Sequence, residues 1–211
     1  MKRTLKILTA GTVLAGALAL SVNSCDISLD TKGESLPGSI RVHFNSACLP
    51  SSSKAEPVCL PDTNDFILSI KDSGGRLIYG GSYGAAPSEI LADPGTYTIC
   101  VESCEFGEPQ FDCPQYGDTE IVVVKSGQVS SVTLFCTQQN CGVRLRFAPE
   151  FVSAYPSSSL FVKSSTGRLL YGYSEKRFAY FLPGSISLVL SESQGERTLY
   201  TRTLSPQDML S

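Results

Sequence analysis

Residues 71–80 read Lys-Asp-Ser-Gly-Gly-Arg-Leu-Ile-Tyr-Gly, and residues 163–172 read Lys-Ser-Ser-Thr-Gly-Arg-Leu-Leu-Tyr-Gly. Both stretches contain the core Gly-Arg-Leu-(Ile/Leu)-Tyr-Gly, at an offset of 92 residues. The glycines mark a turn, and the aliphatic and aromatic residues that follow favour a strand. A turn-and-strand unit that recurs in this way indicates that the body of the chain is built twice from one strand-rich repeat.

Two further pairs of segments repeat in the same order. Ile-Arg-Val-His-Phe at 40–44 corresponds to Val-Arg-Leu-Arg-Phe at 143–147, and Pro-Gly-Thr-Tyr-Thr-Ile at 94–99 corresponds to Pro-Gly-Ser-Ile-Ser-Leu at 183–188. The offsets fall from 103 through 92 to 89 residues, so the second copy has shorter loops. One continuous sandwich with fortuitous similarity is the alternative, but three matches in one order favour a duplication.

Apolar and polar residues alternate along several segments of both copies. In residues 40–44, Ile, Val and Phe alternate with Arg and His, and residues 97–101 alternate in the same way. A period of two places one set of side chains on a buried face and the other in solvent. We find no helical pattern after residue 24, so the sequence predicts an all-β fold.

The spacing of these segments predicts an antiparallel β-sandwich of immunoglobulin type in each copy. Tyr97 stands at a strand start, as in a tyrosine corner, although the usual Cys two residues later and the Trp are absent. The first copy has about seven predicted strands, at 38–45, 65–71, 76–80, 88–91, 95–102, 118–125 and 128–136. The second has about six, at 142–147, 158–164, 168–172, 177–181, 185–192 and 196–203.

We divide the chain into a signal peptide (1–24), a tether (25–36), a first β-sandwich (37–137) and a second, shorter one (138–211). The second copy has no predicted counterpart of strand 128–136, which would expose unpaired backbone groups at an edge. Either six strands suffice, with the C-terminal tail over the edge, or a strand from a partner chain completes the second sandwich.

The first 24 residues have the layout of an export signal. Lys2, Arg3 and Lys6 precede an uncharged apolar run over residues 7–20. This run is too short to span a bilayer, which needs about 20 residues. The segment therefore predicts secretion.

Val-Asn-Ser-Cys at 22–25 resembles a bacterial lipobox, so we expect cleavage before Cys25 and lipid attachment to it. Two or three acyl chains would anchor the protein stably, since each buried CH₂ contributes about 0.8 kcal/mol. The alternative is a plain signal peptide with an incidental cysteine. The polar, acidic residues that follow are expected to lift the folded part off the membrane. We therefore expect a location in the cell envelope, at the outer membrane or cell surface.

Composition excludes several functions. The chain has 211 residues, of which 42% are hydrophobic, as is ordinary for a globular protein. Its net charge is −3, and because the first 24 residues hold three basic and no acidic side chains, the remainder is near −6. A mildly acidic protein is not expected to bind nucleic acid. The single His argues against catalysis that depends on histidine, and the absence of Trp removes the side chain that stacks best on sugars.

Eight cysteines in an exported chain predict disulfides. With Cys25 lipidated, seven remain, so at least one stays outside an intramolecular bridge. A Cys48–Cys59 bridge would restrain a long loop rich in Pro and Ser, and would contribute on the order of 3 kcal/mol. A Cys104–Cys113 bridge would restrain a second loop in the same way.

Cys100, Cys136 and Cys141 are left unassigned. Alternation places Cys136 on the buried face and Cys100 outward, so we expect Cys136 to be a buried thiol outside any bridge. Cys100 and Cys104 have a spacing seen in zinc sites, but no second such pair exists. We therefore expect no metal site.

Catalytic signals are weak. Gly-Gly-Ser-Tyr-Gly at 80–84 matches G-x-S-x-G, but the following Ala-Ala-Pro breaks any helix and the single His43 points outward by alternation. The acidic loop residues could gather around calcium, but they lack the spacing of a known calcium loop. We expect no enzyme and no cofactor. These acidic residues are Glu102, Glu105, Glu108 and Asp112.

The best candidate for a binding surface is the loop closed by Cys104 and Cys113, because sandwiches carry function on loops. Phe106, Phe111 and Tyr116 supply aromatic area near acidic residues. Two interpretations stay open: these aromatics contact a ligand, or they cover a small core of the loop itself.

The order of motifs now carries a resemblance: lipobox, acidic tether, Gly-Arg-Leu-Ile-Tyr turn, Pro-Gly-Thr-Tyr-Thr strand, and Leu134-Phe135-Cys136 leading through Asn140 into the second unit. Over residues 37–205 this is similar to an uncharacterised family of Bacteroidetes surface lipoproteins, fimbrillin-like in style. The resemblance implies tandem Ig-like or transthyretin-like sandwiches, cell-surface exposure and an adhesive or fimbrial role. It supplies no catalytic residues.

We therefore predict a non-enzymatic, lipid-anchored envelope protein that serves adhesion or fimbria-like assembly. The alternative is a glycan- or peptide-binding lipoprotein of a nutrient-uptake complex. Expected partners are the membrane, through the lipid, a protein at the edge of the second sandwich, and a glycan.

Overall fold

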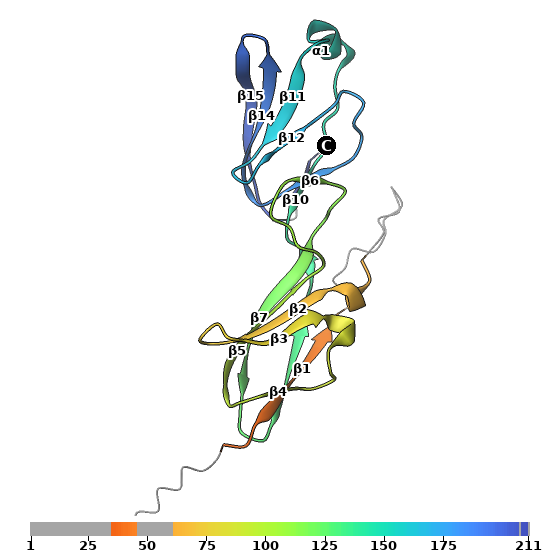
Figure 1. The fold of residues 1–211 in the computed structure, drawn as a ribbon. Coiled ribbons are helices and arrows are strands. Elements are labelled where there is room, and N and C mark those ends of the chain that lie inside the picture. Colours follow the sequence, from red (N-terminus) through yellow and green to blue (C-terminus); the bar gives the residue numbers. More distant parts are fainter. Residues whose placement is uncertain (1–34, 46–60, 207, 211) are drawn as a thin grey trace, which may run out of the picture. The chain divides into compact units, whose positions relative to one another are not determined.

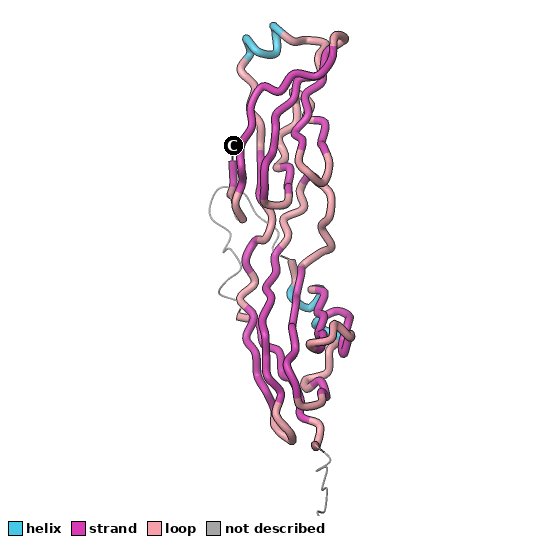
Figure 2. Tube along the Cα trace, turned by 90° about the vertical axis from the view of Figure 1, so that its left-hand side faces the viewer, coloured by secondary structure: helices cyan, strands magenta, loops and turns pink. Residues whose placement is uncertain are grey.

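The structure is a computed structural model that describes residues 35–45, 61–206 and 208–210. The compact unit that contains them spans Ser35–Ser211. Strands dominate it, and its helical turns are short (Figure 2). None of the described helices is both long and apolar enough to cross a membrane.

The first sandwich is made of a three-stranded and a five-stranded sheet (Figure 1). The three-stranded sheet has the order β4-β1-β8, and the five-stranded sheet has the order β3-β2-β5-β7-β9. The strands are β1 (Gly38–Phe44), β2 (Ile67–Asp72), β3 (Leu77–Ser82), β4 (Ile90–Ala92), β5 (Gly95–Glu102), β7 (Tyr116–Val124), β8 (Val129–Leu134) and β9 (Thr137–Gln138).

The second sandwich is made of two four-stranded sheets, with the orders β16-β10-β13-β6 and β12-β11-β14-β15. Its strands are β6 (Gln110–Phe111), β10 (Cys141–Val143), β11 (Ser159–Lys163), β12 (Arg168–Leu170), β13 (Ala179–Phe181), β14 (Gly184–Glu192), β15 (Gly195–Leu204) and β16 (Met209–Leu210). The predicted all-β sandwich fold is confirmed. The residue boundaries that we drew between the sandwiches stay a prediction.

The order of strands repeats between the two sandwiches. The order β4-β1-β8 corresponds to β13-β10-β16, and the order β3-β2-β5-β7 corresponds to β12-β11-β14-β15. The expectation that the second copy lacks a counterpart of strand 128–136 is therefore wrong, because β16 occupies that position. The counterpart is only two residues long, which is too short for a periodic pattern to predict it.

Two strand pairs are parallel, whereas we expected antiparallel sandwiches throughout. Strand β8 pairs in parallel with β1, and β16 pairs in parallel with β10. The cause is a crossover: β8 follows β7 through a turn in which Gly127 has a φ of 64°, and then joins the opposite sheet beside β1.

The repeated turn is closed by a side chain at the same place in each copy. Asp72 Oδ1 accepts hydrogen bonds from the backbone N–H groups of Gly74 and Arg76, both at 2.9 Å. In the second copy, Ser164 Oγ accepts from the N–H of Thr166 at 3.3 Å. Short side-chain oxygens that accept from the backbone two residues ahead stabilise such turns locally.

The predicted tyrosine corner is present in the first sandwich. The hydroxyl of Tyr97 donates to the carbonyl of Asp93 at 2.7 Å, four residues upstream. The Tyr97 side chain is 3% exposed, and its burial raises its pKa. The hydrogen bond satisfies the one polar atom of a side chain that otherwise packs in the core.

Each sandwich has its own hydrophobic core. The first includes Ile40, Leu68, Ile99 and Leu134, which are all fully buried. The second includes Val162, Tyr171, Phe181 and Leu204. Alternation along β2 and β5 places Leu68, Ile70, Ile99 and Val101 inside, as the period of two predicts.

Three short helical turns in the described part of the chain contradict the expectation that no helix follows residue 24. They are the 3₁₀ helices Thr63–Asp65 and Tyr83–Ala85 and the α-helix α1 (Pro149–Ala154). Pro149 stands at the start of α1, where its missing N–H removes no hydrogen bond. A helix of six residues is too short to leave an amphipathic pattern in the sequence.

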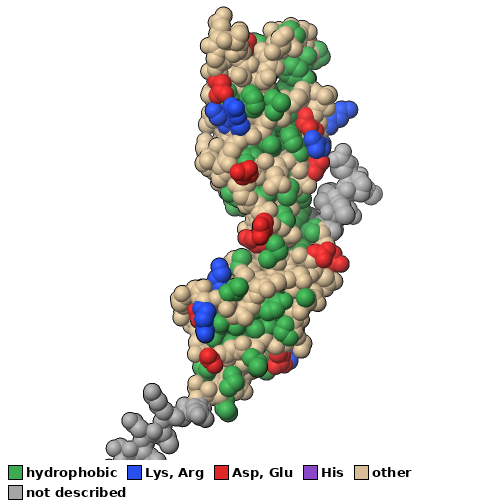
Figure 3. Space-filling model, viewed as in Figure 1, with side chains coloured by type: hydrophobic (Ala, Val, Ile, Leu, Met, Phe, Trp, Pro, Cys, Tyr) green, Lys and Arg blue, Asp and Glu red, His purple; other side chains and the backbone are tan. Residues whose placement is uncertain are grey.

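The described surface mixes side chains of all kinds. On the face drawn in Figure 3, acidic and basic side chains form small separate groups between apolar ones. Ile121 and Val123 of β7 are 68% and 58% exposed. They alternate with inward-facing Val122 and Val124, so a strand rich in apolar residues presents half of them to solvent.

Candidate functional site

The predicted binding loop joins β5 to β7 over residues 103–115. Its Gln110 and Phe111 form β6, which pairs antiparallel with β13: Phe111 lies opposite Ala179, and Gln110 lies opposite Tyr180. The first copy therefore contributes a strand to a sheet of the second sandwich. We expected a loop closed by Cys104 and Cys113 with no strand in it, but the exposed edge of β13 provides backbone partners for these two residues.

Phe111 packs against the second core. Its ring makes an edge contact with Tyr171, with centroids 5.4 Å apart. The guanidinium of Arg177 lies over the Phe111 ring, 4.6 Å from its centroid. Phe111 thus contacts both an aromatic side chain and a cation, and both contacts favour a fixed position of its ring.

The three aromatic residues predicted to form one binding surface are separated by the fold. Tyr116 starts β7 and is 2% exposed in the first core, where burial raises its pKa. Phe111 belongs to the second core, and Phe106 is half-buried in the loop. Of the two interpretations left open, packing therefore holds for Phe111 and Tyr116, although they pack in the sandwich cores and not within the loop.

A buried amide ties the loop to the connection between the sandwiches. Asn140 is fully buried; its Nδ2 donates to the carbonyl of Cys113 at 2.9 Å, and its Oδ1 accepts from the N–H of Gln115 at 3.0 Å. Gln115 Nε2 donates to the carbonyl of Cys104, and Gln138 Nε2 donates to that of Asn140. Sequence reasoning noted Asn140 only as part of a motif, because nothing local indicates partners 25 residues away.

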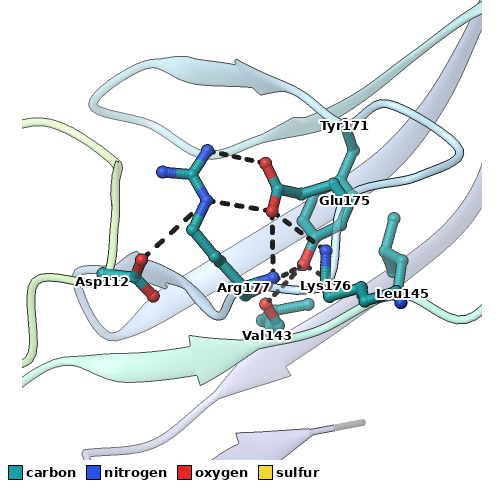
Figure 4. Close-up of polar contacts among 7 residues, drawn as sticks. All are labelled: Asp112, Val143, Leu145, Tyr171, Glu175, Lys176 and Arg177. Carbon is teal, nitrogen blue, oxygen red and sulfur yellow. Dashed lines mark hydrogen bonds and ion pairs between the residues drawn. The ribbon is translucent and has the colours of Figure 1, made fainter.

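An ion-pair cluster lies at the far end of the loop (Figure 4). Arg177 Nε donates to Glu175 Oε1 at 3.0 Å, and its terminal nitrogen donates to Glu175 Oε2 at 2.7 Å. Arg177 also approaches Asp112 of the loop, at 3.9 Å. The hydrogen bonds from the Arg177 side chain and backbone lower the pKa of Glu175 to about 2. Sequence reasoning named Asp112 only as a possible calcium ligand.

The same cluster contains the second-copy tyrosine of the repeated motif. The Tyr171 hydroxyl donates to the carbonyl of Arg177 at 2.6 Å and accepts from the N–H of Leu145 at 3.3 Å. Figure 4 shows the ring reaching between the turn that carries Glu175 and the strand that carries Val143. The Tyr171 hydroxyl also lies 3.3 Å from the carbonyl oxygen of Val143, so Tyr171 fixes β10 and this turn to each other.

We predict that Glu175→Gln makes stability less sensitive to acid. A carboxyl group whose pKa falls from 4.5 to about 2 on folding contributes stability above pH 4.5, and loses it as the pH falls towards 2. The gap in urea midpoint between the natural protein and the variant should therefore shrink over this range. The matched control is Glu105→Gln, which replaces an exposed carboxyl group. An equal gap at pH 5 and pH 2.5 would contradict the prediction.

The cysteines of the loop lie close together. Cys104 Sγ and Cys113 Sγ are 3.7 Å apart and are not joined by a disulfide. Burial and the neighbouring Cys104 raise the pKa of Cys113 to about 11. Cys136 and Cys141 are buried, and Cys100 is half-buried. The predicted sites at Cys25, Cys48 and Cys59 lie outside the described residues.

The structure places the residues of the weak catalytic signals, His43 and the G-x-S-x-G segment, on separate elements. His43 is exposed on β1. Ser82 of G-x-S-x-G ends β3 and leads into the 3₁₀ helix Tyr83–Ala85, not into the α-helix of a nucleophile elbow. Within the described ranges, no three His, Cys, Asp or Glu side chains are grouped to hold a metal ion.

Comparisons with known proteins give one family and several structures. The family described as "Domain of unknown function (DUF4493)" matches residues 41–210. No curated protein matches the chain. A candidate polysaccharide-binding protein from Bacteroides thetaiotaomicron is 8% identical with a TM-score of 0.41, over 80% of each chain.

Two further similar structures are a fimbrial anchor protein and a candidate cell adhesion protein. The fimbrial anchor protein Mfa2 from Porphyromonas gingivalis is 14% identical with a TM-score of 0.40, over 80% of this chain and 82% of that one. A candidate cell adhesion protein from Bacteroides fragilis is 11% identical with a TM-score of 0.36, over 82% of this chain and 90% of that one.

Proposed function

Because the chain belongs to the family described as "Domain of unknown function (DUF4493)", whose description gives no activity, we propose from its own residues that it is a non-enzymatic, lipid-anchored envelope protein that serves adhesion or fimbria-like assembly. The lipobox-like residues 22–25 support the anchor, since cleavage there would leave Cys25 as the first residue. The protein would then lie at the outer membrane or the cell surface.

The observation that carries the proposed role is the shared strand. Pulling the sandwiches apart would break the β6–β13 pairing, the hydrogen bonds of Asn140 and the ion pair between Asp112 and Arg177. All of these contacts involve the same short loop, so we expect them to break together. Two sandwiches coupled in this way transmit tension as one body, which suits a surface protein that holds a cell to a partner.

The proposal is tested in a bacterial host that processes lipoproteins. We expect the natural protein to incorporate a labelled fatty acid, and Cys25→Ser to abolish the labelling and the adherence of the cells. Cys100→Ser, in a half-buried thiol, is the matched control and should keep both. Labelling that persists in Cys25→Ser would refute the anchor. Adherence equal in cells with and without the protein would refute the role, and polysaccharide binding lost in Phe106→Ala would favour a glycan receptor.

We further propose that Cys104 and Cys113 form a disulfide after export. Their sulfur atoms lie 3.7 Å apart at the two ends of the loop that carries β6. Closing this loop contributes roughly 2.5 to 3 kcal/mol by restricting the unfolded chain. Mass spectrometry of non-reduced peptides should recover the two residues in one cross-linked fragment. Cys104→Ser should lower the urea midpoint under oxidising but not reducing conditions, and equal effects would contradict the bridge.

A further inference from the structure

A groove lies beside the continuation of β10 in the second sandwich. It has a volume of about 410 Å³, and its walls come from β10 and from the inner face of the β12-β11-β14-β15 sheet. The apolar side chains include Val143, Leu145, Val162 and Leu188, and β15 adds Tyr200 and Arg202. β14 and β15 can be followed in Figure 1.

The first sandwich shows what fills the same place there. Strand β8 runs parallel to β1 over six residue pairs, from Ser39 opposite Val129 to Phe44 opposite Leu134. Leu134 is fully buried, and Val132 packs against the same core. A strand with alternate apolar residues thus closes that side of the first sandwich.

The register of the repeat locates the corresponding positions in the second sandwich. Strand β16 pairs with β10 through Gly142 opposite Met209, as Ser39 lies opposite Val129. The counterparts of Val42 and Phe44, at the offset of 103 residues, are Leu145 and Phe147.

Strand pairing stops early in the second sandwich. The described pairs of β10 and β16 end at Val143, so within residues 35–45, 61–206 and 208–210 no strand pairs with residues 144–147 as β8 pairs with β1. We predicted a strand over 142–147, and the structure ends it at Val143 because its later residues have no described partner strand.

The side chains around this position are left open to solvent. Tyr200 lies opposite Leu188 on the inner face of its sheet, yet it is 58% exposed. Leu145 and Phe147 pack against the second core but are only partly buried. An apolar strand laid here would remove this surface from water, as Val132 and Leu134 do in the first sandwich.

We propose that this groove receives an extended segment of a partner protein, which adds a strand parallel to β10 beside residues 144–147. The proposal rests on the proposed role in assembly and names the chemistry of the partner. The segment carries apolar side chains at alternate positions, facing inward as Val132 and Leu134 do. Main-chain hydrogen bonds would supply affinity, and the side chains would supply specificity.

The charged side chains of the groove indicate which residues the partner strand carries between its apolar positions. Arg144 and Arg146 alternate with Leu145 along one wall, and Arg202 lies on the other. Neither Arg146 nor Arg202 forms an ion pair with another described residue. The donor strand therefore carries acidic side chains at the positions next to Arg144 and Arg146, since opposite charges side by side on neighbouring strands stabilise the pairing.

The test uses the full chain and a synthetic peptide that copies residues 131–135 with S131D and T133D, because β16 already occupies the positions that correspond to residues 129 and 130. By the register above, the two aspartates would lie beside Arg144 and Arg146, and Val and Leu would face the core. We expect saturable binding by fluorescence anisotropy, and slower amide hydrogen exchange at residues 144–147. The matched peptide with S131K and T133K should bind at least tenfold more weakly.

A charge exchange makes the result specific to this groove. Arg146→Glu changes an exposed side chain, so the variant should fold. It should bind the aspartate peptide at least tenfold more weakly than the natural protein does, and it should bind the lysine peptide more tightly. No binding of the aspartate peptide, or equal binding of a scrambled peptide, would overturn the proposal. So would an unchanged affinity of Arg146→Glu. None of these outcomes depends on the fatty-acid labelling of Cys25. The partner strand at this groove and the proposed lipid anchor can therefore be refuted independently.

Discussion

Asn140→Ala should lower the free energy of unfolding by about 3 kcal/mol, because it leaves the N–H of Gln115 and the carbonyl of Cys113 without their buried partner. Alanine has no side-chain donor or acceptor, so it removes both hydrogen bonds. Urea unfolding followed by tyrosine fluorescence measures this change.

The matched control for Asn140→Ala is Gln128→Ala, which changes an exposed side chain in the turn between β7 and β8. Exposed substitutions of this kind usually change stability by less than about 0.5 kcal/mol. If the two variants unfold at the same urea concentration, Asn140 does not brace the loop as the structure indicates. A second variant, Asn140→Asp, keeps the shape and should be destabilised because it buries a charge in place of an amide.

Phe111→Ala should destabilise the second sandwich by about 2 to 3 kcal/mol, although the residue belongs to the first copy in sequence. Truncating a buried phenylalanine to alanine costs about 3–5 kcal/mol, and Phe111 is only partly buried. The change removes the contacts with Tyr171 and with the guanidinium of Arg177. Amide hydrogen exchange should accelerate in β13, and more than in β2 of the first sandwich.

Phe106→Ala is the matched control for Phe111→Ala, since it removes the same side chain from the same loop. Phe106 is half-buried, and we expect a smaller change, below about 1 kcal/mol. Equal destabilisation by the two variants would contradict the assignment of Phe111 to the second core. Faster exchange confined to the first sandwich would contradict the shared strand.

Local pattern was enough for the parts of the fold that depend on neighbouring residues. The turn at Asp72 is closed by side-chain oxygens that accept from backbone groups two and four residues ahead, so its residues alone predict it. The inward set of β2 and β5 follows from alternation, and the corner at Tyr97 follows from its place at a strand start.

Most of the candidate site could not be predicted in this way. Strand β6 has two residues between Gly, Pro and acidic neighbours, so it has no period to detect. It exists because β13, far along the chain, presents an edge to it. Strand β16 is equally short, and α1 has a single full turn. Such elements are decided by tertiary partners, and propensity has little influence on them.

The repeated tyrosine separates the two kinds of information. The sequence by itself determined that Tyr79 and Tyr171 hold the same place in a duplicated turn-and-strand unit, because that unit forms from local hydrogen bonds and alternation. Tertiary structure alone decided that Tyr171 is 1% exposed while Tyr79 is half-exposed. Phe111, which belongs to the first copy in sequence, covers Tyr171 but not Tyr79. A contact between two distant segments leaves no periodic pattern in the sequence of either segment.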